Sequence, residues 1–161
     1  MIDYTLRPIT KADDPAVCEL IKTVGREFGA VGEGFGPGDA EVEAMSRHYL
    51  AKDRARYWVA ECGGEIVGCG GIAAFNGSPG VCELRKLFVL PGYRGKGIGK
   101  ALTLTGLEYA KSVGYQQCYL DTLANMTTAI ALYQQLGFEH LPQPLGGTIH
   151  GGCDVWMIKT L

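Results

Sequence analysis

The sequence predicts a mixed α/β fold in which one β-sheet is covered by helices. Two glycine-containing turns separate three strand-like stretches in the middle of the chain, and stretches with helical spacing stand before and after them. The elements follow in the order β-α-α-β-β-β-α-β-α-β. Because hairpins join antiparallel strands and strand–helix–strand units join parallel ones, we expect a sheet with both kinds of pairing.

The N-terminal third is predicted to hold one strand, two helices and a loop. Pro15 stands where the first turn of a helix accepts proline, and Asp39 can cap the next helix. Between the two helices, residues 29–38 contain five glycines, which indicates an irregular loop of the kind that often carries recognition. The predicted strand covers 4–8, and the two predicted helices cover 16–28 and 40–52.

The remaining two thirds alternate between strands and helices. Gly63 and Gly64 form the first hairpin turn, and Gly114 ends a helix that begins in a glycine-rich loop. Residues 140–152 are predicted to be a loop. The predicted strands cover 56–62, 65–75, 81–90, 115–123 and 153–161, and the predicted helices lie within 94–114 and 126–138.

Composition narrows the class of protein. The 161 residues suit a single domain over 1–161, and the net charge of −2 argues against a dedicated nucleic-acid binder. No apolar run approaches the roughly 20 residues that cross a bilayer, so we expect no membrane association. The first residues lack the basic start and apolar stretch of a signal peptide, which favours a cytoplasmic location.

The six cysteines are not spaced for a metal site or a redox motif. None forms a Cys-x-x-Cys pair, and no Cys/His spacing resembles a zinc site, so we expect no metal. A nucleophilic cysteine is the alternative, but no histidine stands in a motif that would activate one. We therefore expect reduced thiols in the core, on the strand-like residues Cys69, Cys82, Cys118 and Cys153.

The segment from Arg94 to Lys100 is the most informative part of the chain. A predicted strand leads into a loop with glycines at 95, 97 and 99, and the loop opens a helix. Helix N-termini present unpaired N–H groups and a partial positive charge, which together bind phosphate. The segment does not match a P-loop, because Ala101 follows Lys100, and it lacks the third glycine of a dinucleotide-binding fingerprint.

A third pattern does fit these residues. Arg94-Gly-Lys-Gly-Ile-Gly99 matches Arg/Gln-x-x-Gly-x-Gly/Ala, and it resembles the pyrophosphate loop of the GNAT superfamily of N-acetyltransferases. The stretch NMTTAIALYQQLGF downstream also resembles that family in order and spacing, so that the resemblance covers about residues 81–139. It implies a mixed, mostly antiparallel sheet of about six to seven strands, flanked by about four helices and splayed at the coenzyme A site.

The resemblance also implies acetyl-CoA as co-substrate and assigns residues to it. The pantetheine arm is expected to insert where the strand 81–90 parts from the strand 115–123, in a form of β-augmentation. The residues expected to contact the coenzyme are Leu87, Phe88 and Val89 on the strand, Arg94, Gly95, Lys96, Gly97, Ile98, Gly99 and Lys100 in the loop, and Asn125 and Tyr133 further on.

The reaction requires a base for the amine, donors for an oxyanion and an acid for the thiolate. Glu83 is expected to be the base, because it lies eleven residues before Arg94, as the base glutamate does in the histone-type members that the chain resembles. One alternative is that ordered water takes the proton. The other is that Glu83 only pairs with Arg85 or Lys86. Tyr133 is expected to protonate the thiolate, and its alternative is a core role. A backbone N–H near Val89 is expected at the oxyanion.

The acceptor is the open part of the prediction. Glu33 and Phe35 in the loop 29–38 are candidate substrate contacts, and the acidic residues around them suit a cationic amine. A small-molecule amine is favoured, transferred by direct attack in a ternary complex; a protein N-terminus or lysine is the alternative within the enzyme class. A silent coenzyme A sensor is the alternative of another class. The acyl group is left open between acetyl and longer, and a homodimer is compatible with the family.

Overall fold

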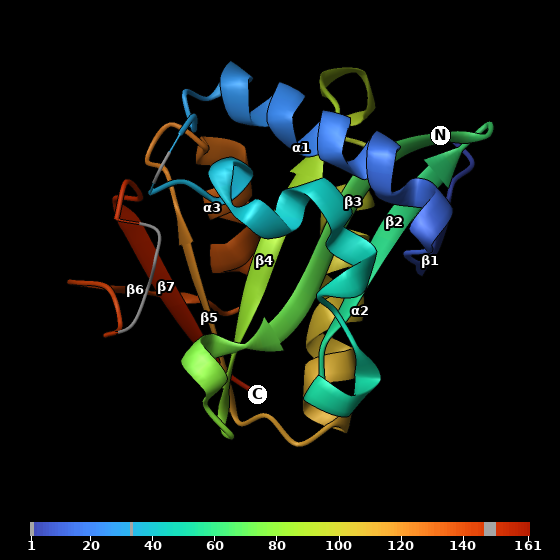
Figure 1. Cartoon of the computed structure of the whole chain (residues 1–161). Helices are drawn as coiled ribbons and strands as arrows, with labels where there is room; N and C mark the ends of the chain where they lie inside the picture. Colours follow the sequence, from blue (N-terminus) through green and yellow to red (C-terminus); the bar gives the residue numbers. More distant parts are fainter. Residues whose placement is uncertain (1, 33, 147–150) are drawn as a thin grey trace.

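The computed structural model describes residues 2–32, 34–146 and 151–161, and within them seven strands form one sheet (Figure 1). The strand order is β1-β2-β3-β4-β5-β7-β6, and every neighbouring pair is antiparallel except β4 and β5. The strands are β1 Thr5–Pro8, β2 Arg56–Cys62, β3 Glu65–Ala74, β4 Val81–Val89, β5 Gln117–Thr122, β6 Glu139–Leu141 and β7 Val155–Thr160. The predicted mixed, mostly antiparallel sheet is confirmed.

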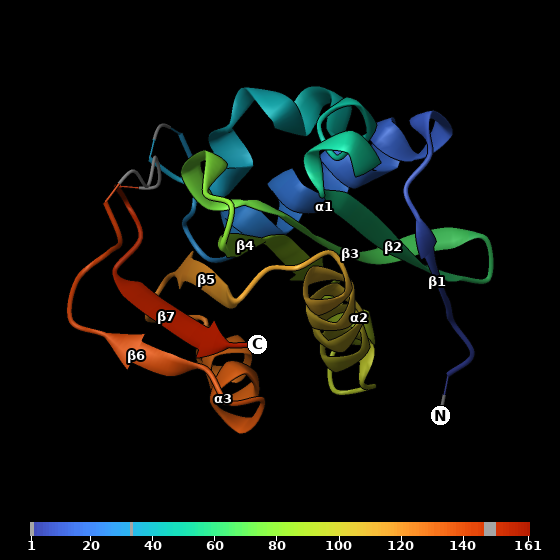
Figure 2. The same cartoon turned by 90° about the horizontal axis from the view of Figure 1, so that it is seen from below.

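Helices cover both faces of this sheet, as the view from below shows (Figure 2). Helix α1 (Asp14–Glu27) and the 3₁₀ helix η3 (Ala40–Arg47) cover one face; α2 (Ile98–Ser112) and α3 (Thr127–Gln135) cover the other. Among the described residues, no helix is both long and apolar enough to span a bilayer. The short 3₁₀ helices are η1 Lys11–Asp13, η2 Gly36–Gly38, η4 Ala51–Asp53, η5 Phe75–Gly77 and η6 Pro91–Tyr93.

Two predicted elements differ from the structure. The predicted helix 40–52 is the 3₁₀ helix η3, which is kinked at Ala44, followed by a separate turn at 51–53. The predicted loop 140–152 begins inside a short strand, because β6 pairs with β7 through Glu139–Leu141. The last strand, β7, therefore lies between β5 and β6 and is not an edge of the sheet. A strand of three residues is too short to show an alternation in the sequence.

A separate apolar core lies under each helical layer. Under α1 and η3 the core includes Val17, Ile21 and Met45, while under α2 and α3 it includes Leu102 and Leu120. Cys69, Cys82 and Cys118 are fully buried, as predicted, and Cys153 is half-buried; none of the six thiols forms a disulfide. Burial raises the pKa of the Cys69 thiol to about 12, so this thiol stays protonated at neutral pH.

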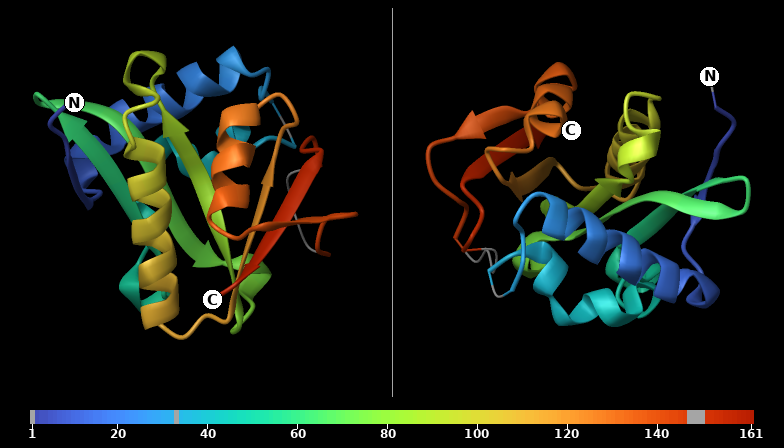
Figure 3. Two further views of the ribbon diagram at one scale, coloured as in Figure 1. Left: turned by 180° about the vertical axis from the view of Figure 1, so that it is seen from behind. Right: turned by 90° about the horizontal axis from the view of Figure 1, so that it is seen from above.

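The sheet opens between β4 and β5. The two strands pair in parallel only where Val81–Glu83 face Gln117–Tyr119, although β4 continues to Val89 and β5 to Thr122. Beyond Glu83, neither strand is paired with the other. Seen from behind, α2 and α3 stand on either side of β4 over this opening (Figure 3). The predicted splay of the sheet is present.

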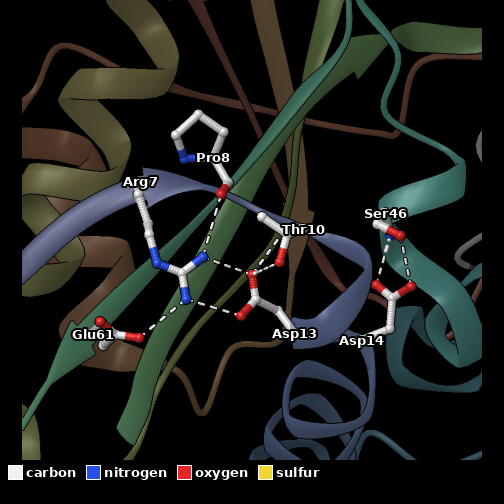
Figure 4. Close-up of polar contacts among 7 residues, drawn as sticks. All are labelled: Arg7, Pro8, Thr10, Asp13, Asp14, Ser46 and Glu61. Atoms are coloured by element: carbon white, nitrogen blue, oxygen red, sulfur yellow. Dashed lines mark hydrogen bonds and ion pairs between the residues drawn. The ribbon is translucent and has the colours of Figure 1, made fainter. Parts of the chain in front are cut away.

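Polar contacts near the N-terminus fix the layer of α1 and η3 to the sheet (Figure 4). The Arg7 guanidinium donates to both carboxylate oxygens of Asp13, at 2.7 and 2.9 Å, and to Glu61 on β2 at 3.0 Å. The Asp14 carboxylate accepts hydrogen bonds from the Ser46 backbone N–H at 2.8 Å and from its hydroxyl at 2.6 Å. These contacts hold the start of α1 on the sheet and join η3 to α1.

Asp13→Asn is expected to lower the free energy of unfolding by about 2 kcal/mol at pH 7. The Arg7 guanidinium lowers the pKa of the Asp13 carboxyl to about 2 in the folded protein. This stabilisation is therefore present above about pH 4, the ordinary range for an aspartate, and is lost as the pH falls towards 2. Urea unfolding at several pH values measures it. The exposed Asp3→Asn is the control, and a pH-independent difference between Asp13→Asn and the wild type would contradict the assignment.

Candidate active site

A pocket occupies the opening between β4 and β5. Its walls come from the end of β4, the end of β5, the start of α3 and the loop before η2, so that residues from both faces of the sheet reach it. The residues that line it are Ala30, Phe35, Gly36, Pro37, Glu83, Leu84, Arg85, Lys86, Leu87, Phe88, Leu120, Asp121, Thr122, Leu123, Met126, Tyr133 and Cys153. The pocket thus joins five residues predicted for the site: Phe35, Glu83, Leu87, Phe88 and Tyr133.

A β-bulge in β4 shapes this opening. Cys69 on β3 faces Phe88 and Gly71 faces Arg85, so that Gly70 lies opposite two residues of β4, Lys86 and Leu87. Lys86 has a φ of +51°, in the left-handed region that favours glycine. A Cβ on Gly70 would stand 2.5 Å from the Leu87 side chain, so glycine at this position allows the close approach.

Glu83 is the last residue of β4 that pairs with β5, and its side chain is buried in the pocket wall. Arg85, two residues further along the strand, donates from Nε to Glu83 Oε1 at 2.7 Å and from Nη2 to the Ala74 carbonyl at 3.2 Å. The pairing with Arg85 considered from the sequence is therefore present. It does not remove Glu83 from the pocket, because both residues line it.

Lys86 is the centre of a buried ion network. Its Nζ lies 2.9 Å from Asp39 Oδ2 and 3.2 Å from Glu41 Oε2, and its side chain is only 3% exposed. The Tyr49 hydroxyl donates to Glu41 at 2.6 Å. Glu43 pairs with Lys22 on the exposed side of η3 instead. The acidic residues of η3 that the sequence placed around a cationic substrate are therefore already paired with lysines of the chain.

Tyr133 on α3 lines the pocket from the α2–α3 face of the sheet, opposite the face that η3 covers. The residue is 6% exposed, and its ring packs edge-to-face on Phe138 with centroids 5.7 Å apart. Among the described residues its hydroxyl forms no hydrogen bond. Burial raises the pKa of Tyr133 above its ordinary value, so the hydroxyl remains a proton donor at neutral pH. The core role considered as the alternative is therefore present together with a position in the pocket.

The glycine-rich loop forms the start of α2, as predicted. Gly97 is the residue before the helix and has a φ of +87°. The first intrahelical bond to its carbonyl comes from the Ala101 N–H at 3.0 Å, which leaves the N–H groups of residues 98–100 at the helix N-terminus. Lys96 and Lys100 are exposed beside them. This arrangement suits a phosphate.

Two residues predicted to bind coenzyme A contact the end of α1. The Arg94 guanidinium pairs with the Glu27 carboxylate through both terminal nitrogens, and its Nε donates to the Val89 carbonyl at 2.9 Å. The Asn125 side chain donates to the Phe28 carbonyl at 3.0 Å. Arg94 belongs to the β4 side of the opening and Asn125 to the β5 side, so the end of α1 touches both sides.

Two glycine-rich loops meet at the pocket, which Phe35 and Cys153 line. The Gly152 N–H donates to the Gly34 carbonyl at 2.9 Å, and the Phe35 ring packs so closely on Gly152 that a Cβ there would stand 2.5 Å from it. Phe35, predicted to contact substrate, therefore forms part of a roof. Glu33, the other predicted contact, lies outside the described residues.

Arg85, Lys86, Asp121 and Cys153 are pocket residues that the sequence analysis did not assign to the site. The alternation of β4 could have indicated Arg85, because residues two apart on a strand share a face. The position of Lys86 depends on a bulge that no local signal marks. Burial, together with the neighbouring Asp121, raises the pKa of the Cys153 thiol to about 12, which argues against a nucleophilic role.

Within the three described stretches, no group of three histidine, cysteine or acidic side chains could hold a metal ion. The geometry instead offers a phosphate site at α2, a strand edge on β4 beyond Glu83, and a pocket that contains a carboxylate and a tyrosine hydroxyl. A ligand with a phosphate at one end and a reactive group at the other fits this order of features.

Comparison with known proteins agrees with this geometry. Residues 26–138 match the model of the acetyltransferase (GNAT) family. The N-acetyltransferase YjgM of Escherichia coli K12, itself uncharacterized, is 42% identical over 158 residues, which cover 97% of this chain and 94% of that protein. The N-acetylaspartate synthetase of Xenopus tropicalis is 37% identical over 103 residues, 63% of this chain but only 37% of that longer protein.

Solved structures share the fold. A GNAT acetyltransferase from Staphylococcus aureus has a TM-score of 0.80 at 18% identity, over 98% of this chain and 99% of that one. The acetyltransferase yncA from Salmonella typhimurium, solved with acetyl-CoA, has a TM-score of 0.77 at 21% identity, over 98% and 93%. A phosphinothricin acetyltransferase from Sinorhizobium meliloti, also with acetyl-CoA, has a TM-score of 0.77 at 24% identity, over 98% and 88%.

Lys86→Met is expected to destabilise the fold by about 3 kcal/mol, because it leaves the carboxylates of Asp39 and Glu41 without their buried cation. Adding Asp39→Asn should recover part of this loss, so the double variant is more stable than the sum of the single effects predicts. Urea unfolding of the four proteins measures the coupling. Lys22→Met, which breaks an exposed pair on the same helical layer, is the control and should leave stability unchanged. Strict additivity would contradict the network.

Proposed function

The chain belongs to the acetyltransferase (GNAT) family, and from this premise we propose that it transfers an acetyl group from acetyl-CoA to the amine of a small molecule by direct attack. Membership of the family makes the chain an acyltransferase that uses acetyl-CoA. The acceptor and the roles of single residues are our proposal. The observation that supports it best is that one pocket holds both Glu83 and Tyr133 where β4 and β5 part.

The described residues fit the coenzyme. The N–H groups at the start of α2, with Lys96 and Lys100 beside them, would hold the pyrophosphate. The backbone of Leu87, Phe88 and Val89 would bind the pantetheine arm, because this part of β4 is not paired with β5. Bound there, acetyl-CoA supplies the thioester that reacts with the acceptor.

Glu83 is the proposed base. Its carboxylate lies in the pocket wall and accepts a hydrogen bond from Arg85 Nε at 2.7 Å, which orients it. It stands at the point where the strands separate, four residues before the stretch proposed for pantetheine. An amine at the acceptor end of the pocket would therefore meet the base before it meets the thioester.

Tyr133 is the proposed acid. Its hydroxyl forms no hydrogen bond among the described residues, lines the pocket from the α3 side and remains protonated at neutral pH. A phenol of raised pKa can donate a proton to a leaving thiolate at a modest energetic cost. Glu83 and Tyr133 thus approach the pocket from opposite faces of the sheet, so that one group can serve the amine and the other the thiolate.

The two loops at the pocket support a small acceptor. Phe35 packs on Gly152, and a backbone hydrogen bond joins the two loops, which favours a small molecule over a peptide. Two related proteins carry names of small molecules, N-acetylaspartate synthetase and phosphinothricin acetyltransferase. A protein N-terminus or lysine would need the two loops to separate, and is the second candidate.

Release of free coenzyme A, measured with a thiol reagent against a panel of amines, tests the proposal. Glu83→Gln and Tyr133→Phe are each expected to lower kcat by about 10²-fold. Both variants should keep the wild-type affinity for acetyl-CoA, measured by calorimetry, because neither change touches α2 or the backbone of β4. Lys22→Gln, far from the pocket, should match the wild type.

Two outcomes would contradict the proposal. Acetyl-CoA binding without coenzyme A release for any amine or peptide would favour a sensor. Release that needs a peptide and ignores free amines would replace the small-molecule acceptor with a protein. An unchanged kcat in either active-site variant would remove that residue from its proposed role and leave the acetyltransferase assignment intact.

A further inference from the structure

We propose that the acceptor is an α-amino acid, whose carboxylate binds the Arg85 guanidinium while its amine faces Glu83. This inference rests on the proposed function and names its substrate class. Arg85 is a pocket residue whose hydrogen-bonding capacity is only partly used within the described part of the chain. The argument concerns its remaining donors, its burial and its place beside the base.

A guanidinium has five N–H donors arranged in a planar fork. In Arg85, Nε donates to Glu83 and one N–H of Nη2 donates to the Ala74 carbonyl. Nη1 approaches the Glu41 carboxylate only to 3.9 Å, which is beyond hydrogen-bond distance. The Tyr49 hydroxyl also shares a hydrogen bond with the guanidinium, so that three of its five N–H groups have acceptors among the described residues and two do not, although the arginine lines the pocket.

The remaining N–H groups of Arg85 matter because the side chain is largely buried. The Arg85 side chain is 23% exposed, so water reaches only a small part of it. A largely buried guanidinium with unused donors is costly unless an acceptor is supplied. A carboxylate satisfies such a group best, because its two oxygens match the guanidinium fork and carry the opposite charge. The structure thus offers a carboxylate position inside the acceptor pocket.

The neighbouring lysine cannot compete for the same ligand. Lys86 also lines the pocket, but its Nζ is held between Asp39 and Glu41 and its side chain is 3% exposed. Within the described residues, Arg85 is therefore the pocket cation that can receive an anion. The bulge places Arg85 and Lys86 consecutively towards the same helical layer, and the two cations have different tasks: one ties η3 to β4, and the other faces the ligand.

The position of Arg85 beside Glu83 indicates which class of carboxylate-containing amine would fit. Their side chains are in direct contact at 2.7 Å, so a group bound to the guanidinium lies next to the proposed base. In an α-amino acid the amine and the carboxylate are attached to one carbon, and this spacing matches adjacent binding partners. A polyamine has no carboxylate that could accept hydrogen bonds from the guanidinium, and its further positive charges would face that cation.

Matched pairs of acceptors test the inference: L-amino acids and the corresponding amino acid amides, assayed for coenzyme A release. The wild type is expected to prefer the acid over the amide of the accepted side chain by about 10²-fold in kcat/KM. The comparison is stringent, because an amide substituent lowers the pKa of the neighbouring amine and so favours attack by the amide.

Arg85→Lys and Arg85→Gln separate carboxylate recognition from support of Glu83. Both should raise the KM for the amino acid, by about 10-fold or more, and bring the acid-to-amide ratio in kcat/KM close to one. A loss of Glu83 positioning would slow both acceptors alike and leave the ratio unchanged. Lys22→Gln is the control and should keep the wild-type ratio, and acetyl-CoA affinity measured by calorimetry should be the same in all four proteins.

The outcomes distinguish this inference from the proposed function. Equal use of acids and amides by the wild type, or exclusive use of amines without a carboxylate, would overturn the amino acid acceptor and leave a small-molecule acetyltransferase. A wild-type acid preference that survives in both Arg85 variants would also overturn it. Acetyl-CoA binding with no coenzyme A release for any acceptor would overturn both proposals.

Discussion

The separation of β4 from β5 after three residue pairs is the constraint on which the rest of the structure depends. Parallel neighbours normally continue to pair, and here the bulge at Lys86 alters the course of β4 at the place where pairing has stopped. The left-handed conformation of a non-glycine residue costs free energy of the order of 1 kcal/mol. The Tyr57 hydroxyl, which donates to the Lys86 carbonyl at 2.6 Å, and the two carboxylates on Nζ oppose that cost.

The same bulge connects the two ends of the site. Lys86 ties η3 to β4 through Asp39 and Glu41, and the next three residues form the edge proposed for pantetheine. A buried ion network contributes little net stability, since desolvation of the charges opposes their attraction. Its effect is positional, because removal of Lys86 takes away the cation that Asp39 and Glu41 share. The residues proposed for the acceptor, Glu83 and Arg85, and those proposed for pantetheine therefore lie on one strand, β4, which fixes their spacing.

Local signals account for what the sequence could predict. Arg94–Gly99 is a contiguous motif, so the loop, the helix it opens and the coenzyme could be recognised without any distant contact. The partners of Arg94 and Asn125 could not, because Glu27 and Phe28 lie 67 and 97 positions away in the chain. The bulge could not be predicted for a similar reason. The residue with positive φ, Lys86, is not a glycine, and the glycine that allows the close approach, Gly70, lies on the neighbouring strand β3. The roof of Phe35 and Gly152 joins loops from opposite ends of the sequence.

This contrast has a physical origin in the kind of group that each half of the site uses. The proposed coenzyme contacts are backbone N–H and C=O groups on β4 and at the start of α2, which almost any sequence with suitable glycines can present. Chains only 18–24% identical therefore share this fold. The acceptor contacts that we propose are side chains on one face of β4 and on two glycine-rich loops, where a single substitution changes charge and shape. The donor can consequently be read from a short motif, whereas the proposed acceptor site depends on which side chains the bulge and the loops bring together, among them Arg85 beside Glu83.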